Sequence, residues 1–331
     1  MKDTLLKTIK HKKQEIILVV VIILISLIFQ SLNSVFLSWG NITSVFSNYA
    51  VYGIMSLGMM LVISTGNIDV SVGGVLALIS MSISSLVLSE RINNPVTAIL
   101  ISLAFGVVLG LINGLLVAKL KLPAIIVTLG TLNIMRGTLL LGIGSQWKSG
   151  LPAWFTAIAR TIPFGIGFKI TAYIWVLMCF LTWFFMHYTI WGRRIIAAGS
   201  NAEASVRIGF NPAVAYILAF SVMGFMIGLG SLFYTANIGI AQPLAGMGYE
   251  MILISAAVIG GTSFSGGHIS ILGTFLGVLL LGIVENGMII SKIPVYWQEM
   301  MRGIVIIAAI VFLTIKVVRK KSVTLSGEKS T

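Results

Sequence analysis

The chain has 331 residues, of which 57% are hydrophobic and 9% are charged, and its formal net charge is +13. A soluble domain carries about a quarter charged residues, so this composition excludes a soluble globular protein. With a mean hydropathy of +1.04, the sequence predicts an all-α polytopic membrane protein.

Ten apolar stretches have lengths near the roughly 20 residues that a transmembrane helix needs. Eight spans are the alternative to ten, because stretches 43–65 and 251–265 are re-entrant or broken in that interpretation. An even number of spans places both termini on one side. The expected spans are residues 16–37, 43–65, 71–89, 96–118, 123–144, 171–189, 213–236, 251–265, 270–290 and 297–317.

The basic residues follow topology and do not form a nucleic-acid groove. Five precede the first span, five lie at or after the end of the last, and five more lie in two loops on the same side. Lysine and arginine accumulate in cytoplasmic loops, so we expect both termini in the cytoplasm. The chain then divides into a basic N-terminal tail (1–15), a membrane domain (16–317) containing a cytoplasmic loop at 190–212, and a C-terminal tail (318–331). The three basic groups are Lys2, Lys7, Lys10, Lys12 and Lys13; Lys316, Arg319, Lys320, Lys321 and Lys329; and Lys119, Lys121, Arg193, Arg194 and Arg207.

Two polar, glycine-rich segments interrupt apolar runs, at residues 65–74 and 260–268. Such backbone is tolerated at membrane depth only where protein buries it or water reaches it, and paired interruptions indicate a transport path at a repeat interface. Asp69 is a functional candidate as an acid near the membrane, or it caps the helix that begins at Val70 or Ser71. The candidate path or helix-break residues are Asn67, Asp69, Ser71, Thr128, Thr262 and Ser263.

A weak internal echo accompanies the two interruptions. Residues 110–114, followed by Lys121, Pro123 and Arg136, recur as residues 282–287, followed by Lys292, Pro294 and Arg302. In the predicted topology the two copies cross the membrane in opposite directions. The sequence therefore raises the possibility of an inverted repeat, with chance similarity as the alternative.

The loop at 190–212 contains a short polar helix with its own end signals. Asn201 is suited to cap the first free N–H groups, Glu203 lies in the positive first turn, and Gly209 is placed to end the helix. A small, stiff helix presented to the cytoplasm offers a docking surface to a soluble protein. Its residues of interest are Gly199, Asn201, Glu203, Ala204, Arg207 and Gly209.

Several catalytic signatures are missing from the sequence. It lacks a G-x-x-x-x-G-K-[ST] phosphate loop, and its three histidines show no metal-binding pattern. Ser263 and Ser265 with His268 superficially suggest a hydrolase nucleophile, but a G-x-S-x-G frame is not met. We therefore expect no catalytic residue, no metal and no cofactor in this chain.

The order of these segments resembles the membrane subunit of carbohydrate-type ABC importers, the ribose/xylose/rhamnose/autoinducer-2 permease family. The similarity extends over nearly the whole chain. Within the family, residues 67–71, 147–152 and 293–297 are most similar to the autoinducer-2 branch. The segments that carry the resemblance are residues 66–73, 122–132 with 136–137, 192–209, 246–250, 258–263 and 266–267.

The resemblance implies a pore subunit in the cytoplasmic membrane that pairs with an identical or related permease. Cytoplasmic ATPases would bind ATP and magnesium and receive the helix at 201–209, and an external binding protein would deliver the solute. Autoinducer-2 is the favoured cargo, with rhamnose, ribose or another monosaccharide as alternatives. Two other classes stay open, namely an ion-coupled sugar carrier that uses Asp69 and a membrane hydrolase that uses Ser263 or Ser265.

Overall fold

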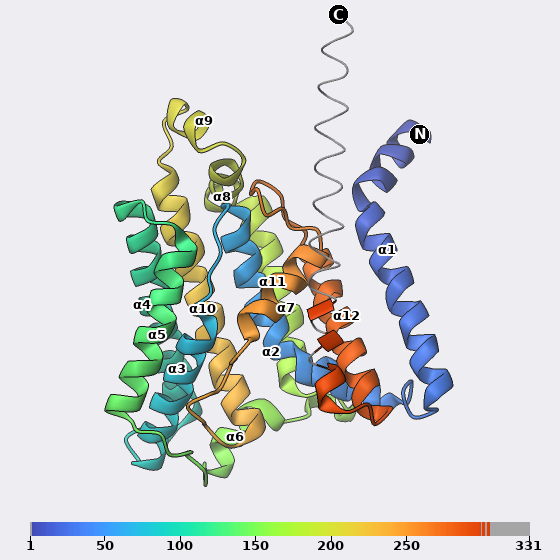
Figure 1. The fold of residues 1–331 in the computed structure, drawn as a ribbon, viewed down its shortest axis with the longest axis vertical. Helices are drawn as coiled ribbons and strands as arrows, with labels where there is room; N and C mark the ends of the chain where they lie inside the picture. Colours follow the sequence, from blue (N-terminus) through green and yellow to red (C-terminus); the bar gives the residue numbers. More distant parts are fainter. Residues whose placement is uncertain (1, 299, 302, 305–331) are drawn as a thin grey trace, which may run out of the picture.

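The computed structural model describes residues 2–298, 300, 301, 303 and 304, and over this part the chain is helical (Figure 1). Within these described residues, the one β-type pairing is an isolated bridge between Lys148 and Ala241. The all-α prediction is confirmed. The α-helices are α1 (Lys2–Leu32), α2 (Trp39–Ser64), α3 (Val72–Leu88), α4 (Pro95–Leu120), α5 (Ala124–Gly142), α6 (Ala153–Arg160), α7 (Ile170–Tyr188), α8 (Ile190–Ser200), α9 (Ala202–Arg207), α10 (Pro212–Ile238), α11 (Tyr249–Ile259) and α12 (Ile271–Ile290), and a 3₁₀ turn, η1, covers Pro163–Gly165.

Among the described residues, seven helices are long and apolar enough to cross a membrane, namely α1, α2, α4, α5, α7, α10 and α12. Within α1, the apolar part that could cross is Lys13–Leu32. The tenth expected span, 297–317, falls largely outside the described residues. The sequence did not predict α6, η1 or α8 as separate elements.

Helix α2 forms the centre of the bundle. It is 26 residues long, or about 39 Å, and almost all of its second half is buried. Ser38 caps its start by accepting the N–H of Asn41, and the chain leaves its end at Gly66 with a φ of +79°. The alternative in which stretch 43–65 is broken is therefore wrong, because this stretch is one continuous helix.

Among the described residues, two apolar helices are too short to count as candidate spans. Helix α3 has 17 residues and α11 has 11, which correspond to about 25 Å and 16 Å against the roughly 30 Å of hydrocarbon. The expected span 251–265 is thus corrected: its helix ends at Ile259 because the backbone turns at Gly261, whose φ is +103°. Non-helical segments 65–71 and 239–248 lead into these two half-helices.

The helices on either side of the two half-helices run in opposite directions (Figure 1). Helix α2 runs toward the end of the bundle that carries α8 and α9, the chain turns back, and α3 runs away before α4 returns. Helix α10 starts at that end and runs away, α11 runs back, and α12 runs away again. These directions are those that an inverted repeat requires, with Gly110 of α4 corresponding to Gly282 of α12.

Helices α4 and α10 pack through glycines with their backbones in contact. A Cβ at Gly106 would lie against the carbonyl oxygen of Gly224, and a Cβ at Gly110 would lie against that of Phe220. Rows of small residues allow such close approach in membranes. Plain helix packing accounts for these glycines, as their four-residue spacing indicates.

We predict that Gly110→Leu forces α4 and α10 apart and lowers the free energy of unfolding by about 1–3 kcal/mol or more. The matched control is Gly137→Leu in α5, where a Cβ meets nothing within 4 Å and leucine has the better helix propensity. Thermal unfolding in detergent measures both. Equal melting temperatures for the two variants would contradict this packing.

Candidate translocation site and coupling surface

The two half-helices begin against one another inside the bundle. A Cβ on Gly73, in the first turn of α3, would collide with the carbonyl oxygen of Gly246, just before α11. Gly246 and Gly248 have φ of +68° and +80°, a region that favours glycine. The contact thus joins a glycine of the first predicted interruption, 65–74, to a glycine of segment 239–248, which the sequence did not indicate as a break. The second predicted interruption, 260–268, follows α11.

An acid lies beside this contact. One carboxylate oxygen of Glu250 lies 3.3 Å from the position of a Cβ on Gly73, and it is buried without a hydrogen-bond partner among the described residues. Glu250 occupies the first turn of α11, where the helix dipole favours negative charge.

A chain of buried hydrogen bonds holds the segment that leads into α3. Asp69 Oδ1 accepts the backbone N–H of Ser71 at 2.8 Å and its hydroxyl at 2.5 Å. The Nδ2 group of Asn113 on α4 donates to Ser71 Oγ at 2.9 Å. Thr131 Oγ1 on α5 donates to Asn113 Oδ1 at 2.7 Å. This Asp69–Ser71–Asn113–Thr131 network links the first break to two transmembrane helices.

A fifth residue completes the support of this break. Thr128 Oγ1 accepts the N–H of Val70 at 3.1 Å and donates to the carbonyl of Ala124 at 2.8 Å. Asp69, Ser71 and Thr128, three of the six predicted path residues, therefore lie together. Sequence reasoning missed Asn113 and Thr131, although a polar side chain within an apolar span was the available signal.

The other three predicted path residues lie outside this network. Asn67 Nδ2 donates to Thr65 Oγ1 at 2.9 Å, close to the end of α2. Thr262 and Ser263 belong to the second break; Thr262 is fully buried, and the N–H of Ser263 donates to the carbonyl of His268. The second break meets the end of α2, next to the first break, where the N–H of Gly267 donates to the carbonyl of Ser64 at 2.8 Å.

The second break does not contain a serine–histidine pair in the described structure. His268 Nδ1 lies 3.1 Å from the carbonyl oxygen of Gly261, and a carbonyl only accepts, so this nitrogen carries the proton. No hydrogen bond joins the imidazole to Ser263 or Ser265 in the part of the chain that the structure describes. The geometry therefore gives no support to a hydrolase.

Helices α8 and α9 project from one end of the bundle (Figure 1). Asn201 caps α9 by accepting the N–H of Ala204 at 2.9 Å, with Glu203 in the first turn and Arg207 in the last. Gly209 leaves the helix with a φ of +80°. The predicted capped helix is present, and α8 precedes it as a separate helix.

The tip of α9 exposes apolar side chains within a polar surface. Val206 and Ile208 are 61% and 78% exposed, and Glu203 and Arg207 beside them are also exposed. Cation–π contacts link α8 to the segment after α9. The Arg194 guanidinium lies 5.0 Å from the ring centroids of Trp191 and of Phe210. Apolar groups rimmed by charge are typical of a protein contact.

Helix α8 contacts both breaks directly. A Cβ on Gly199 would collide with the carbonyl oxygen of Ser64, and one on Gly266 would lie 2.6 Å from the carbonyl oxygen of Gly199. The last turn of α8 therefore packs on the end of α2 and on the glycines of the second break.

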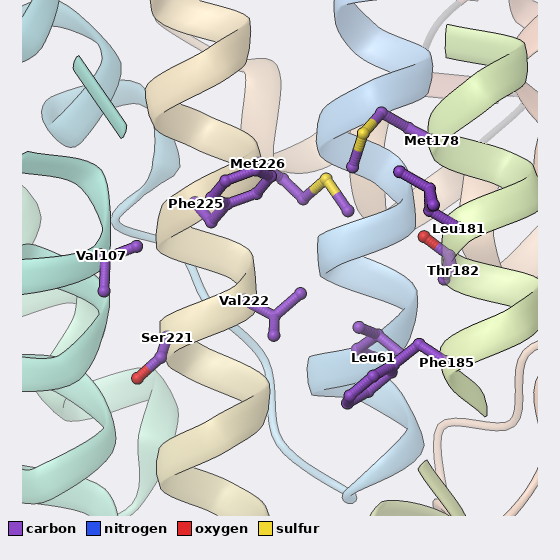
Figure 2. Close-up of a pocket in the computed structure, with 10 residues that line it drawn as sticks. All are labelled: Leu61, Val107, Met178, Leu181, Thr182, Phe185, Ser221, Val222, Phe225 and Met226. Atoms are coloured by element: carbon purple, nitrogen blue, oxygen red, sulfur yellow. The ribbon is translucent and has the colours of Figure 1, made fainter. Parts of the chain in front are cut away.

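An apolar cavity of about 380 Å³ lies between α2, α4, α7 and α10 (Figure 2). Of its lining residues, only Thr182 and Ser221 carry a hydroxyl, and the Ser221 hydroxyl already donates to the carbonyl of Ile217. Burying a polar solute there without hydrogen bonds is costly. This cavity does not suit a polar cargo.

We predict that Asp69→Asn keeps nearly the wild-type stability, because the amide oxygen still accepts the bonds of Ser71. Asp69→Ala leaves the Ser71 N–H buried without its acceptor, at a cost of about 1–3 kcal/mol. Thermal unfolding of both variants in detergent provides the comparison. An equal loss in both would show that the negative charge itself is required.

The comparisons with known proteins agree with this architecture. Residues 41–310 match the sequence family described as the permease component of a branched-chain amino acid transport system. The chain is 35% identical, over 85% of its length and 80% of the relative's, to the autoinducer 2 import system permease protein LsrC of Salmonella choleraesuis (strain SC-B67). It is 33% identical to the LsrC protein of Escherichia coli O9:H4 (strain HS), over 93% of this chain and 89% of that protein.

No solved structure matches the chain. The family match covers most of the sequence, and both relatives are aligned over more than two thirds of their lengths. Both are permease proteins of import systems by name, which agrees with a polytopic bundle that contains paired helix breaks. The chain belongs to this family of membrane transport permeases.

Proposed function

We propose that this chain is the pore subunit of an ATP-driven importer for autoinducer 2 in the cytoplasmic membrane. The observation that carries the proposal is the 33–35% identity to LsrC permeases over most of the chain. The described residues supply a route with two helix breaks, and the sequence lacks a phosphate-binding loop. Energy must then come from another subunit, which holds ATP and magnesium.

The surface formed by α9 is the proposed docking site for the ATPases. Exposed Val206 and Ile208 supply apolar contact area, and Glu203 and Arg207 supply charge that sets the orientation. An ATPase that closes on nucleotide would push α8 against Ser64 and Gly267, at the point where the second break meets the end of α2. Helix-in-groove docking is the physical mode of this contact.

The distribution of charge supports a cytoplasmic position for this surface. Lys119 and Lys121 at the end of α4 and Arg193, Arg194 and Arg207 in α8 and α9 occupy one end of the bundle (Figure 1). Five basic residues lie toward the other end, and the positive-inside rule places the first group in the cytoplasm. The start of α1 lies at the same end, so the N-terminus is cytoplasmic too. The five are Arg91, Lys148, Arg160, Lys169 and Lys292.

The remaining partners follow from the import task. A second permease subunit, identical or related, completes the pore within the lipid bilayer, and an external binding protein delivers the cargo. Rhamnose, ribose or another monosaccharide is the alternative cargo. An ion-coupled carrier is less well supported, because both hydrogen bonds of the Asp69 carboxylate go to Ser71 and hold the break.

Uptake in the native host tests the proposal. Cells that express the wild-type gene should accumulate isotope-labelled autoinducer 2, and gene deletion should abolish this uptake. Uptake should persist when an ionophore collapses the proton and sodium gradients while ATP is maintained. Uptake that stops with the gradients would establish the ion-coupled carrier, and preferential uptake of ribose or rhamnose would reassign the cargo.

We predict that Glu203→Lys together with Arg207→Glu reduces ATP-driven uptake at least tenfold while the protein still reaches the membrane. The reason is that both charges at the docking surface are reversed. The matched control is Glu90→Lys with Arg91→Glu, an exposed pair at the opposite end. Normal uptake by the first variant would rule out α9 as the docking element.

A further inference from the structure

A second cavity, of about 260 Å³, lies between α2, α10, α11 and α12. It is located toward the end of the bundle opposite α8 and α9, because Asn237 is near the end of α10 and Asn286 is in the last part of α12. Its lining contains three asparagines (Asn48, Asn237 and Asn286) and four tyrosines, and none of its lining residues is charged.

The oxygen atoms of the three amides are already engaged. Lys169 Nζ donates to Asn237 Oδ1 at 2.8 Å and to Asn48 Oδ1 at 3.4 Å. Asn41 Nδ2 donates to Asn286 Oδ1 at 2.9 Å. A lysine ammonium can only donate, so it fixes which way the first two amides face.

The NH₂ group of each amide can donate hydrogen bonds to a bound solute. Within the described ranges, no hydrogen bond uses the NH₂ groups of Asn48, Asn237 or Asn286. Burial and the neighbouring Arg160 guanidinium lower the pKa of Lys169. The cavity thus has three amide donors, and the hydrogen bonds that Lys169 and Asn41 donate to the amide oxygens fix their orientation.

The tyrosines supply flat apolar surface next to these donors. The ring centroids of Tyr52 and Tyr249 are 4.5 Å apart, those of Tyr49 and Tyr52 are 5.5 Å apart, and Tyr234 meets Tyr249 edge to face at 5.9 Å. An aromatic face covers the apolar C–H side of a small ring, and the amide groups bond its polar edge. Few polar groups on an aromatic wall are typical of a small-molecule site.

We propose that this cavity, lined by Asn48, Asn237, Asn286 and the four tyrosines, is a binding site within one subunit for a small, uncharged, hydroxylated solute. The identification of that solute with the imported cargo rests on the proposed function. A volume just below the roughly 300–1,000 Å³ of drug-sized sites suits a compact molecule. The absence of charge from the lining disfavours a zwitterion such as a branched-chain amino acid, whose two charges would be left unpaired.

The cavity adjoins the contact between the half-helices. Tyr249 is the first residue of α11 and follows Gly246 and Gly248, the glycines that meet α3. A solute that stacks on Tyr249 therefore touches the start of the half-helix that must move if the breaks rearrange. This places solute recognition one turn or less from the proposed path.

Saturation-transfer NMR on the full chain in lipid nanodiscs tests the site directly. The probes are autoinducer 2, D-ribose, L-rhamnose and L-leucine, each alone. We expect saturation of the ring protons of at least one hydroxylated probe and none for leucine. Asn48→Ala combined with Asn237→Ala should weaken that binding by roughly tenfold or more, as the loss of two hydrogen bonds implies.

The control is Asn93→Ala, an exposed asparagine outside the cavity lining, which should bind as the wild type does. Thermal unfolding verifies that the asparagine double variant and the control are folded. If the double variant does not fold, Tyr52→Leu replaces it as the cavity variant. Unchanged affinity in the folded cavity variant, a preference for leucine, or no binding of any hydroxylated probe would overturn the proposal. ATP-dependent uptake is measured in a separate experiment. If the wild-type protein binds a hydroxylated probe but supports no uptake, the proposed function is wrong. If uptake occurs and the cavity variants do not change it, the proposed site is wrong.

Discussion

Inside the helix bundle, some backbone N–H and C=O groups lie outside any helix, and the structure depends on how these groups find hydrogen-bond partners. A bilayer offers these groups no water, yet segments 65–71 and 239–248 leave the helical path. The chain places the two half-helix starts in backbone contact at Gly73 and Gly246. It then holds the first segment with the Asp69–Ser71–Asn113–Thr131 network and with Thr128. These contacts stabilise non-helical backbone inside the bundle.

The same constraint connects the interior to the surface. The predicted breaks, 65–74 and 260–268, both reach the end of the bundle that carries α8. There the Gly267 N–H donates to the Ser64 carbonyl, and Gly199 packs against Ser64 and Gly266. Helix α9 extends this contact outward through exposed Val206 and Ile208. Toward the other end, Tyr249 joins the polar cavity to the start of α11. One continuous set of contacts therefore runs from the proposed docking surface to the proposed solute site.

Local signals in the sequence predicted much of this arrangement. Apolar length gave most of the spans, glycine-rich polarity located both breaks, and Asn201 with Gly209 marked the ends of α9. The sequence could not reveal that α11 is only 11 residues long, because the apolar run continues past its end at Ile259. The sequence also did not predict that Asn113 and Thr131 lie near Asp69, or that Asn48 lies near Asn237. Those neighbourhoods depend on how helices far apart in the sequence pack. The separate α6 and α8 were missed for the related reason that short amphipathic helices between spans resemble loops.

The measurement closest to the central claim is uptake by Gly73→Ala, with Gly130→Ala as its matched control. A Cβ on Gly73 collides with the Gly246 backbone, whereas one on Gly130 meets nothing within 4 Å. If the meeting of the half-helices organises the route, Gly73→Ala loses uptake and melts at a lower temperature, and the control behaves as the wild type. Wild-type uptake and melting in Gly73→Ala would show that the contact between the half-helices does not organise the route.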